Sequence, residues 1–174
     1  MLTQDAATEE ASRNAARQRF ARDCEEMAYS LPEGYFDYVS KVGHWLQLQT
    51  GPTRAIVGAS GAQGSGKTTF ATLVGSQLAL KNKKTLVLSL DDFYLLKSKR
   101  RDLASRIHPL LQTRGVPGTH DIALLEDVKN SFRLGAEQAI PAFDKALDDR
   151  RDDILVDMSQ FEILILEGWC WGVA

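Results

Sequence analysis

The sequence predicts an α/β domain with three α/β/α layers around a parallel sheet, preceded by two helices. Three observations support this fold class. Three short apolar runs are continuous rather than alternating, which is typical of parallel strands covered on both faces. Segments with helical spacing of apolar residues separate these runs. A glycine-rich loop joins the first run to a helix, and right-handed crossovers are expected to bring the strands into one sheet in the order 2-3-1.

The composition narrows the class of protein. The chain has 174 residues, of which 44% are hydrophobic and 25% charged, as expected for one globular domain with a core. A formal net charge of -2 argues against a nucleic-acid partner, and the lack of a long apolar run argues against a membrane span. The start "MLTQDAATEE" resembles no targeting segment, so a cytoplasmic protein is expected. Neither Cys24 nor Cys170 is assigned a chemical role, and the oligomeric state is not predicted.

Two helices are expected before the sheet. Residues from about Ala6 to Ala28 carry a thin apolar stripe at near-helical spacing, which predicts a surface helix. The string "SLPE" is a capping box, which predicts a second helix from Ser30 to about Gln49. Residues 1–52 are therefore interpreted as an N-terminal helical extension, and residues 53–174 as the α/β domain.

The strands and the first crossover helix follow in order. "AIVGAS" is predicted to be the first strand, and Thr68 to Leu80 the helix after it. "KTLVLSL", from Lys84 to Leu90, is predicted to be the second strand. "FEILILEG" contains the third strand, from about Glu162 to Leu166. All three are expected to be parallel.

Between the second and third strands the prediction is mixed. The basic, turn-rich segment from Lys97 to Gly118 is predicted to be a loop with a short helical piece around Leu103, and its length suggests a functional role. A helix is then predicted from about Asp121 to Leu134, capped by Thr119 or Asp121 and ended by Gly135.

The glycine-rich loop carries the most specific motif. Gly61 to Thr68 reads GAQGSGKT, which satisfies the phosphate-loop pattern GxxxxGK followed by Ser or Thr. Because a strand precedes the loop and a helix follows it, backbone N–H groups converge where a phosphate would lie. Lys67 is expected to contact the β and γ phosphates, and the Thr68 hydroxyl to ligate Mg²⁺. The sequence therefore predicts a P-loop NTPase-type domain. The residues expected to bind the nucleotide are Gly61, Ala62, Gln63, Gly64, Ser65, Gly66, Lys67, Thr68 and Thr69.

Carboxylates follow the other two strands. Glu167 comes directly after the third strand, where a water-mediated contact to Mg²⁺ is expected. Asp91 and Asp92 follow the second strand, and a carboxylate there can take a proton from an acceptor hydroxyl. Capping of a helix or simple solvation is the alternative interpretation of these two aspartates.

The motifs together resemble a known family. "GASGAQGSGKTT", "LDDFY", "RGVPGTHD", "IPAFDKALDDR" and "ILEGW" resemble, in order and spacing, the phosphate-loop kinases of small metabolites that include uridine kinase, phosphoribulokinase and pantothenate kinase. Within that group the sequence looks most similar to D-glycerate 3-kinase and its bacterial kinase-like relatives. The resemblance covers roughly Arg54 to Gly172. It implies ATP and Mg²⁺ as cofactors and D-glycerate as the favoured small-molecule acceptor.

The resemblance also implies roles for individual residues. Asp91 would be the catalytic base, with Asp92 as its neighbour. Lys67, from the phosphate-loop motif, and Lys145 are the candidate catalytic cations beside it. The acceptor side would be lined by Tyr94, His108, Arg114, His120, Asp121, Lys145 and Arg150.

The residue types on the acceptor side also suit an anionic acceptor. A small anionic acceptor needs cations for its carboxylate, and arginine binds a carboxylate bidentately, so Arg114 is the strongest candidate. Lys145 and Arg150 could instead steady the migrating phosphoryl group, or belong to a solvated loop. The string "KSKRR", Lys97 to Arg101, is interpreted as a solvated loop over the acceptor site rather than a nucleic-acid patch.

Two other functions compete with a glycerate kinase. One is a sister kinase for a nucleoside, pantothenate or ribulose 5-phosphate, with different acceptor loops. The other is a nucleotide-binding switch or a non-catalytic P-loop module. A GTPase-type switch would want DxxG after the third strand, where this chain has "EGWCWG".

The last expectation concerns completeness. Members of the family continue well past the "EGW" strand, and three strands alone leave apolar surface uncovered. We therefore expect a truncated domain, incomplete at its carboxyl end, in which the 174-residue chain alone binds ATP weakly and turns over poorly.

Overall fold

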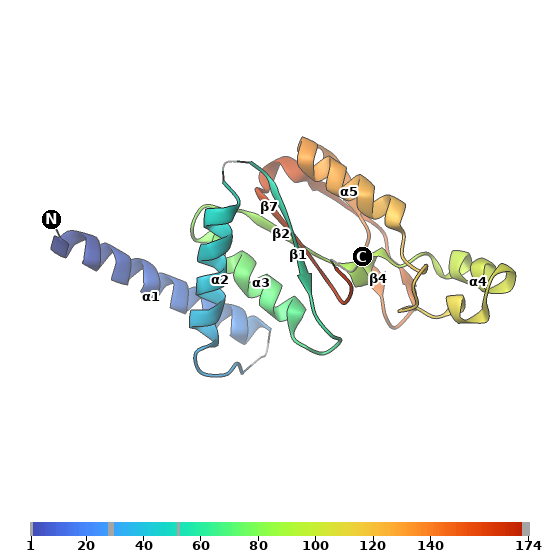
Figure 1. Cartoon of the computed structure of the whole chain (residues 1–174), viewed down its shortest axis with the longest axis horizontal. Coiled ribbons are helices and arrows are strands. Elements are labelled where there is room, and N and C mark those ends of the chain that lie inside the picture. The colour runs from blue at the N-terminus through green and yellow to red at the C-terminus, as the bar shows by residue number, and fades with distance from the viewer. Residues whose placement is uncertain (1, 28–29, 52, 172–174) are drawn as a thin grey trace.

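A computed structural model describes residues 2–27, 30–51 and 53–171 of the chain. Its centre is a three-stranded parallel sheet formed by β1 (Ala55–Ser60), β2 (Thr85–Ser89) and β7 (Ile163–Gly168). β7 lies between the other two, in the order β1-β7-β2, and both neighbours run parallel to it. This is the predicted order 2-3-1, because the third predicted strand is β7 (Figure 1).

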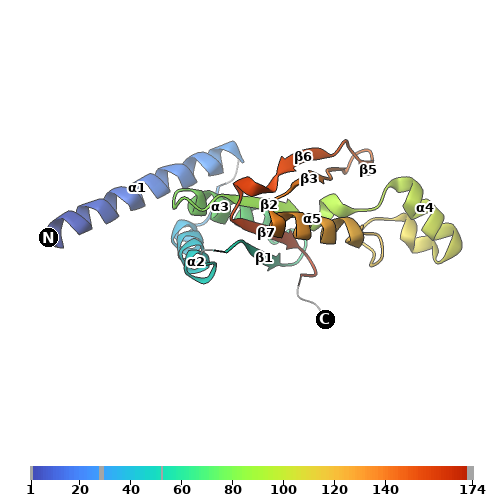
Figure 2. The same ribbon diagram turned by 90° about the horizontal axis from the view of Figure 1, so that it is seen from above.

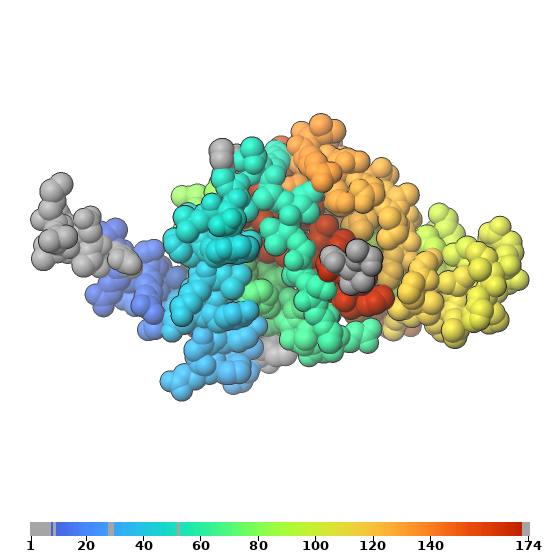
Figure 3. Space-filling view, in the orientation of Figure 1, coloured from blue at the N-terminus to red at the C-terminus, as the bar shows by residue number. Residues whose placement is uncertain are grey.

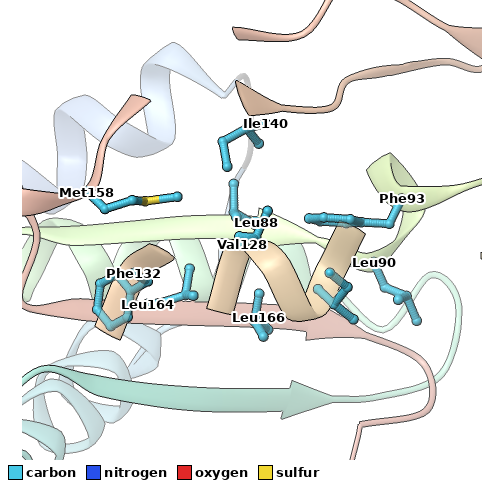
Figure 4. Packing of buried hydrophobic residues seen from close by; sticks show 10 residues of the cluster. Leu88, Leu90, Phe93, Val128, Phe132, Ile140, Met158, Leu164 and Leu166 are labelled. Atoms are coloured by element: carbon cyan, nitrogen blue, oxygen red, sulfur yellow. The ribbon is translucent and has the colours of Figure 1, made fainter. Parts of the chain in front are cut away.

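Helices cover both faces of the sheet. Successive side chains of β7 point to opposite faces, and the apolar ones on each face pack against a helix. Ile163 and Ile165 pack into a cluster with α3 (Lys67–Ala79). Leu164 and Leu166 pack into another with α5 (Ile122–Leu134), including Val128 and Phe132 (Figure 4). All six residues of β7 are buried. The three-layer α/β/α prediction is therefore confirmed.

The two leading helices, α1 (Leu2–Glu26) and α2 (Tyr35–Gln49), pack on the same face of the sheet as α3. Both contact α3, and Val39 and Leu46 of α2 join its cluster. In the space-filling view α1, in blue, projects from the body of the molecule, and the yellow segment around α4 forms the opposite end (Figure 3). No helix in the described parts of the chain has the length and apolar character needed to cross a membrane.

The predicted start of the second helix was wrong. Ser30 lies in coil, and α2 begins at Tyr35. Gly34 precedes the helix with φ of 81°, a left-handed conformation that closes a turn in which Tyr35 N–H donates to the Pro32 carbonyl. The predicted end at Gln49 is confirmed.

The helix α5 matches its predicted limits. Asp121 is the N-cap, because its carboxylate accepts from the backbone N–H of Leu124 at 3.2 Å. Gly135 ends the helix with φ of 68°. Thr119, the alternative cap, instead donates its hydroxyl to the Val116 carbonyl.

Several elements were not predicted. The helical piece predicted around Leu103 is present but longer than expected, because Lys97 to Arg106 form a ten-residue helix, α4, where most of this stretch was predicted to be a loop. β3 (Glu137–Ile140) and β6 (Ile154–Asp157) run side by side as an antiparallel ribbon (Figure 2). β4 (Phe143–Asp144) and β5 (Asp149–Arg150) form a second antiparallel pair. These strands are only two to four residues long, and the apolar run of β6 is shorter than the runs that identified the others.

Three short 3₁₀ helices complete the described part of the chain. They are η1 (Leu90–Phe93), η2 (Pro109–Gln112) and η3 (Met158–Gln160). η1 directly follows β2 and carries the two aspartates of "LDDFY".

Candidate active site

The phosphate loop connects β1 to α3. β1 ends at Ser60 and α3 begins at Lys67, so the loop delivers its backbone to a helix N-terminus. Gly64 and Gly66 have φ values of 73° and 80°, a region that residues with side chains rarely adopt. Gly61 N–H donates to the Gly168 carbonyl at 3.1 Å, which fastens the loop to the end of β7. The loop therefore has the conformation of an anion cradle.

Glu167 and Thr68 meet below the loop. The Thr68 hydroxyl donates to Oε1 of Glu167 at 2.8 Å, although 99 residues separate them. Glu167 is only 2% exposed, and its Oε2 is buried without a hydrogen-bond partner in the described structure. A buried carboxylate oxygen without a partner is unusual, and a cation would satisfy it.

Thr68 and Glu167 are suited to hold Mg²⁺ together with the phosphates of a bound nucleotide. The described residues contain no group of three or more His, Cys, Asp or Glu side chains that could hold a metal ion unaided. Mg²⁺ is usually held by one or two carboxylates together with waters and substrate phosphates. The Thr68 hydroxyl oxygen and the unpaired Oε2 of Glu167 are oxygen ligands that could contribute to such a site.

A cavity of about 660 Å³ lies at this edge of the sheet. We call it the central cavity. Its lining comes from the phosphate loop, from the segment after β2, from the loop before α5 and from the β4–β5 turn. The lining residues are Gln63, Gly64, Lys67, Thr68, Ser89, Asp91, Asp92, Tyr94, Arg114, Gly115, Lys145 and Glu167. The carboxyl ends of parallel strands are where open α/β sheets bind ligands.

Asp91 is the better placed of the two aspartates for chemistry. Its Oδ2 lies 2.9 Å from Nζ of Lys145, and its Oδ1 accepts from the Tyr94 hydroxyl at 3.4 Å. The N-cap of η1 is Ser89, whose hydroxyl accepts from Asp91 N–H, so neither aspartate side chain caps this helix. A carboxylate beside a cation in an open cavity can accept a proton from a bound hydroxyl.

Asp92 has a different environment. Its Oδ1 accepts from the backbone N–H of Phe143 at 3.2 Å, which ties η1 to β4. Burial raises the pKa of this carboxyl above its usual value, and the nearby carboxylates of Asp91 and Glu167 act in the same direction. Asp92 therefore has a structural contact that Asp91 lacks.

Tyr94 forms part of the wall of the central cavity. It is 3% exposed, and burial, with the neighbouring Asp91 carboxylate, raises its pKa to about 12. Its ring stacks on His120 with centroids 4.2 Å apart. Burial lowers the pKa of His120, and its Nε2 is buried without a partner in the described structure. Both side chains are thus held as neutral groups around neutral pH.

His120 and three further candidates lie outside the cavity lining. Asp121 and Arg150 form an ion pair at 3.0 Å, and Arg150 Nε donates to the Tyr94 carbonyl at 2.7 Å. Arg150, held by Asp121, therefore fixes the backbone of Tyr94 through a hydrogen bond. His108 accepts at Nδ1 from Leu110 N–H and caps η2. The acceptor roles of these residues stay predictions.

Sequence reasoning missed one central residue, Arg100. The "KSKRR" string was predicted to be a solvated loop, yet Arg100 has no exposed surface. Its guanidinium donates to the carbonyls of Leu95, Gln112 and Asp148 and pairs with the Asp148 carboxylate. In a string of similar basic residues only the fold distinguishes Arg100, because its burial depends on contacts with segments far away in the sequence.

No known protein-family profile matches the chain. Similar proteins include an uncharacterized kinase of Schizosaccharomyces pombe, 37% identical over 147 residues, covering 77% of this chain and 53% of that protein. The chloroplastic D-glycerate 3-kinase of Arabidopsis thaliana is 29% identical over 130 residues, covering 67% of this chain and 28% of that enzyme. A uridine kinase of Ureaplasma parvum is 27% identical over 113 residues, covering 63% of this chain and 50% of that enzyme.

The solved structures agree with these relatives. The D-glycerate 3-kinase of Cryptococcus neoformans superimposes with a TM-score of 0.67 at 28% identity, covering 78% of this chain and 53% of that one. Homologues of this chain thus include D-glycerate 3-kinase, uridine kinase and kinase-like relatives, and its structural neighbours are P-loop kinases. The chain spans about half or less of the length of the relatives described above.

Proposed function

We propose that this protein is an ATP-dependent kinase that transfers the γ-phosphoryl group of ATP to the 3-hydroxyl of D-glycerate. The observation that carries the proposal is that the phosphate loop, Asp91 and Arg114 line one cavity. The loop suits the phosphates of a nucleotide, and a guanidinium suits the carboxylate of a small hydroxy acid. The D-glycerate 3-kinases among the similar proteins support the same acceptor.

Asp91 has the central role in the proposed reaction. It accepts the proton of the 3-hydroxyl while that oxygen attacks the γ-phosphorus. The bond between the γ-phosphorus and the β–γ bridging oxygen breaks, and ADP leaves. Asp91 also orients the hydroxyl, because attack must occur in line with the leaving oxygen.

The cations of the cavity stabilise the charge that moves during transfer. Lys67 contacts the β and γ phosphates from the phosphate loop. Lys145 lies next to Asp91 and stabilises the transferring group from the acceptor side. Thr68 and Glu167 would hold Mg²⁺, which neutralises phosphate charge when it is bound. Arg114 binds the acceptor carboxylate.

The direct test is a panel of acceptors. Protein expressed from the complete gene is purified and incubated with Mg·ATP and with D-glycerate, uridine, pantothenate or ribulose 5-phosphate, and release of ADP is measured. Glycerate-dependent release is the expected result, and the Lys67→Ala variant provides the background rate. Release with uridine or another acceptor alone would refute the glycerate assignment and favour a sister kinase. ATP binding without release for any acceptor would favour a switch or non-catalytic module.

A further inference from the structure

The turn between β4 and β5 holds an aspartate that joins two arginines. Asp148 accepts from Nη1 of Arg114 at its Oδ1, over 3.3 Å, and its Oδ2 lies 3.1 Å from Nη2 of Arg100. Its own carbonyl accepts from the same Nη2 of Arg100 at 2.6 Å. No role was predicted for Asp148 from the sequence.

Arg100 makes one side of this arrangement rigid. Its side chain is completely buried, and each of its three guanidinium nitrogens donates to a backbone carbonyl. The three carbonyls belong to the segment before α4, to η2 and to the β4–β5 turn. A side chain fixed in this way does not reorient, so the Asp148 carboxylate has a fixed partner.

Arg114 is held from one end only. Its Nη1 donates to the Lys145 carbonyl at 2.9 Å and to Asp148. Its Nε and Nη2 have no hydrogen-bond partner among the residues that the structure describes. Arg114 lines the central cavity, and this Nε–Nη2 edge is the part of its guanidinium that the described protein groups leave unpaired. Such an edge carries two parallel N–H donors, which match the two oxygens of a planar carboxylate.

Asp148 also balances charge at this point. The guanidinium carbons of Arg100 and Arg114 lie 5.7 Å and 5.8 Å from the centre of the Phe143 ring. Two cations around one ring repel each other, and Asp148 is the carboxylate that pairs with both of them. One positive charge remains after this pairing, which suits a ligand with a single negative charge.

We propose that Asp148 is a positioning residue that fixes Arg114 with its Nε–Nη2 edge toward the acceptor, so that the site selects hydroxy acids over neutral alcohols. This inference rests on the proposed kinase function. Asp148 acts through Arg114 and does not touch the acceptor.

The backbone at this position permits clean variants. Asp148 has φ of 53°, a left-handed conformation that glycine and asparagine tolerate well. Asp148→Gly removes the carboxylate without backbone strain, and Asp148→Asn keeps the shape while removing the charge. Because Asp148 also pairs with the buried Arg100, denaturant titration checks that each variant is folded. Asp102→Asn is the matched control, because Asp102 pairs with Arg106 on the exposed face of α4.

The kinetic experiment measures kcat and KM for D-glycerate, for glycerol and for ATP. For Asp148→Gly we expect KM for glycerate to rise on the order of tenfold or more, with KM for ATP and turnover of glycerol changed less than about twofold. Asp148→Asn should show a smaller rise in the same direction, and Asp102→Asn none. An unchanged preference for glycerate over glycerol in Asp148→Gly would overturn the inference while leaving the kinase function intact. A purely structural role would change all substrates together.

A second measurement decides the inference even if the acceptor is wrong. Crystal structures of the wild-type protein and Asp148→Gly are compared at Arg114. Displacement of the Arg114 guanidinium from the Lys145 carbonyl supports the positioning role, and an unmoved guanidinium refutes it. If the wild-type protein phosphorylates no carboxylate-bearing acceptor, the proposed function fails, and the crystal structures still decide what Asp148 does.

Discussion

Replacing Asp91 by asparagine is the sharpest test of the proposed chemistry. The substitution keeps the size of the side chain and removes its ability to accept a proton. Loss of a general base should lower kcat on the order of 10² to 10⁴. At roughly 1.4 kcal/mol for each factor of ten, this corresponds to about 3 to 5 kcal/mol in the activation barrier.

The structure indicates that stability should change far less than the barrier. The ion pair between Asp91 and Lys145 is exposed, with 37% and 65% of the two side chains accessible. Pairs of this exposure contribute roughly 0 to 1 kcal/mol to the free energy of unfolding. A loss of turnover larger than about tenfold therefore could not arise from partial unfolding.

The assay combines ADP release with nucleotide binding. We expect the Asp91→Asn variant to bind ATP as the wild-type protein does, because Asp91 lies outside the phosphate loop, and to lose turnover with D-glycerate. Asp92→Asn is the comparison, since the amide oxygen can still accept from Phe143 N–H. Full turnover by Asp91→Asn would show that Asp91 is not the base.

Three other predictions follow from the same geometry. Lys67→Ala should weaken ATP binding and turnover together, as measured by calorimetry and ADP release, and unchanged values would contradict the assignment of the phosphate loop. Arg100→Met should lower the free energy of unfolding by about 3 to 5 kcal/mol in denaturant titration, because it leaves buried carbonyls and Asp148 without a partner, whereas the exposed neighbour Arg101→Met should have little effect. His120 has a pKa lowered from 6.5 by burial, so the unfolded state binds the extra proton first and stability should fall as pH drops below about 6.5. His120→Phe should flatten that part of the profile of Tm against pH, and an unchanged slope would show that another group titrates.

The sequence was sufficient where the determining interactions are local or follow from hydrophobic pattern. The phosphate loop is one continuous stretch in which Gly64 and Gly66 can adopt the positive φ values that the cradle requires, so the motif itself predicts the cradle. The continuous apolar run of β7 predicted a strand covered on both faces, and right-handed crossovers predicted the order of the sheet. The limits of α5 follow from a cap and a stop within its own residues, Asp121 and Gly135.

The acceptor side was decided by tertiary structure, because its contacts join residues far apart in the chain. Asp91 and Lys145 meet across 54 positions, and Arg100 and Asp148 across 48. Nothing in "KSKRR" distinguishes the buried Arg100 from its exposed neighbours, and nothing in "LDDR" marks the Asp148 that pairs with two arginines. Burial depends on which loops pack together, and a charged residue becomes an anchor only when the fold supplies its partners. The sequence by itself thus determined the phosphate grip and the sheet, and the three-dimensional structure decided which charges surround the acceptor.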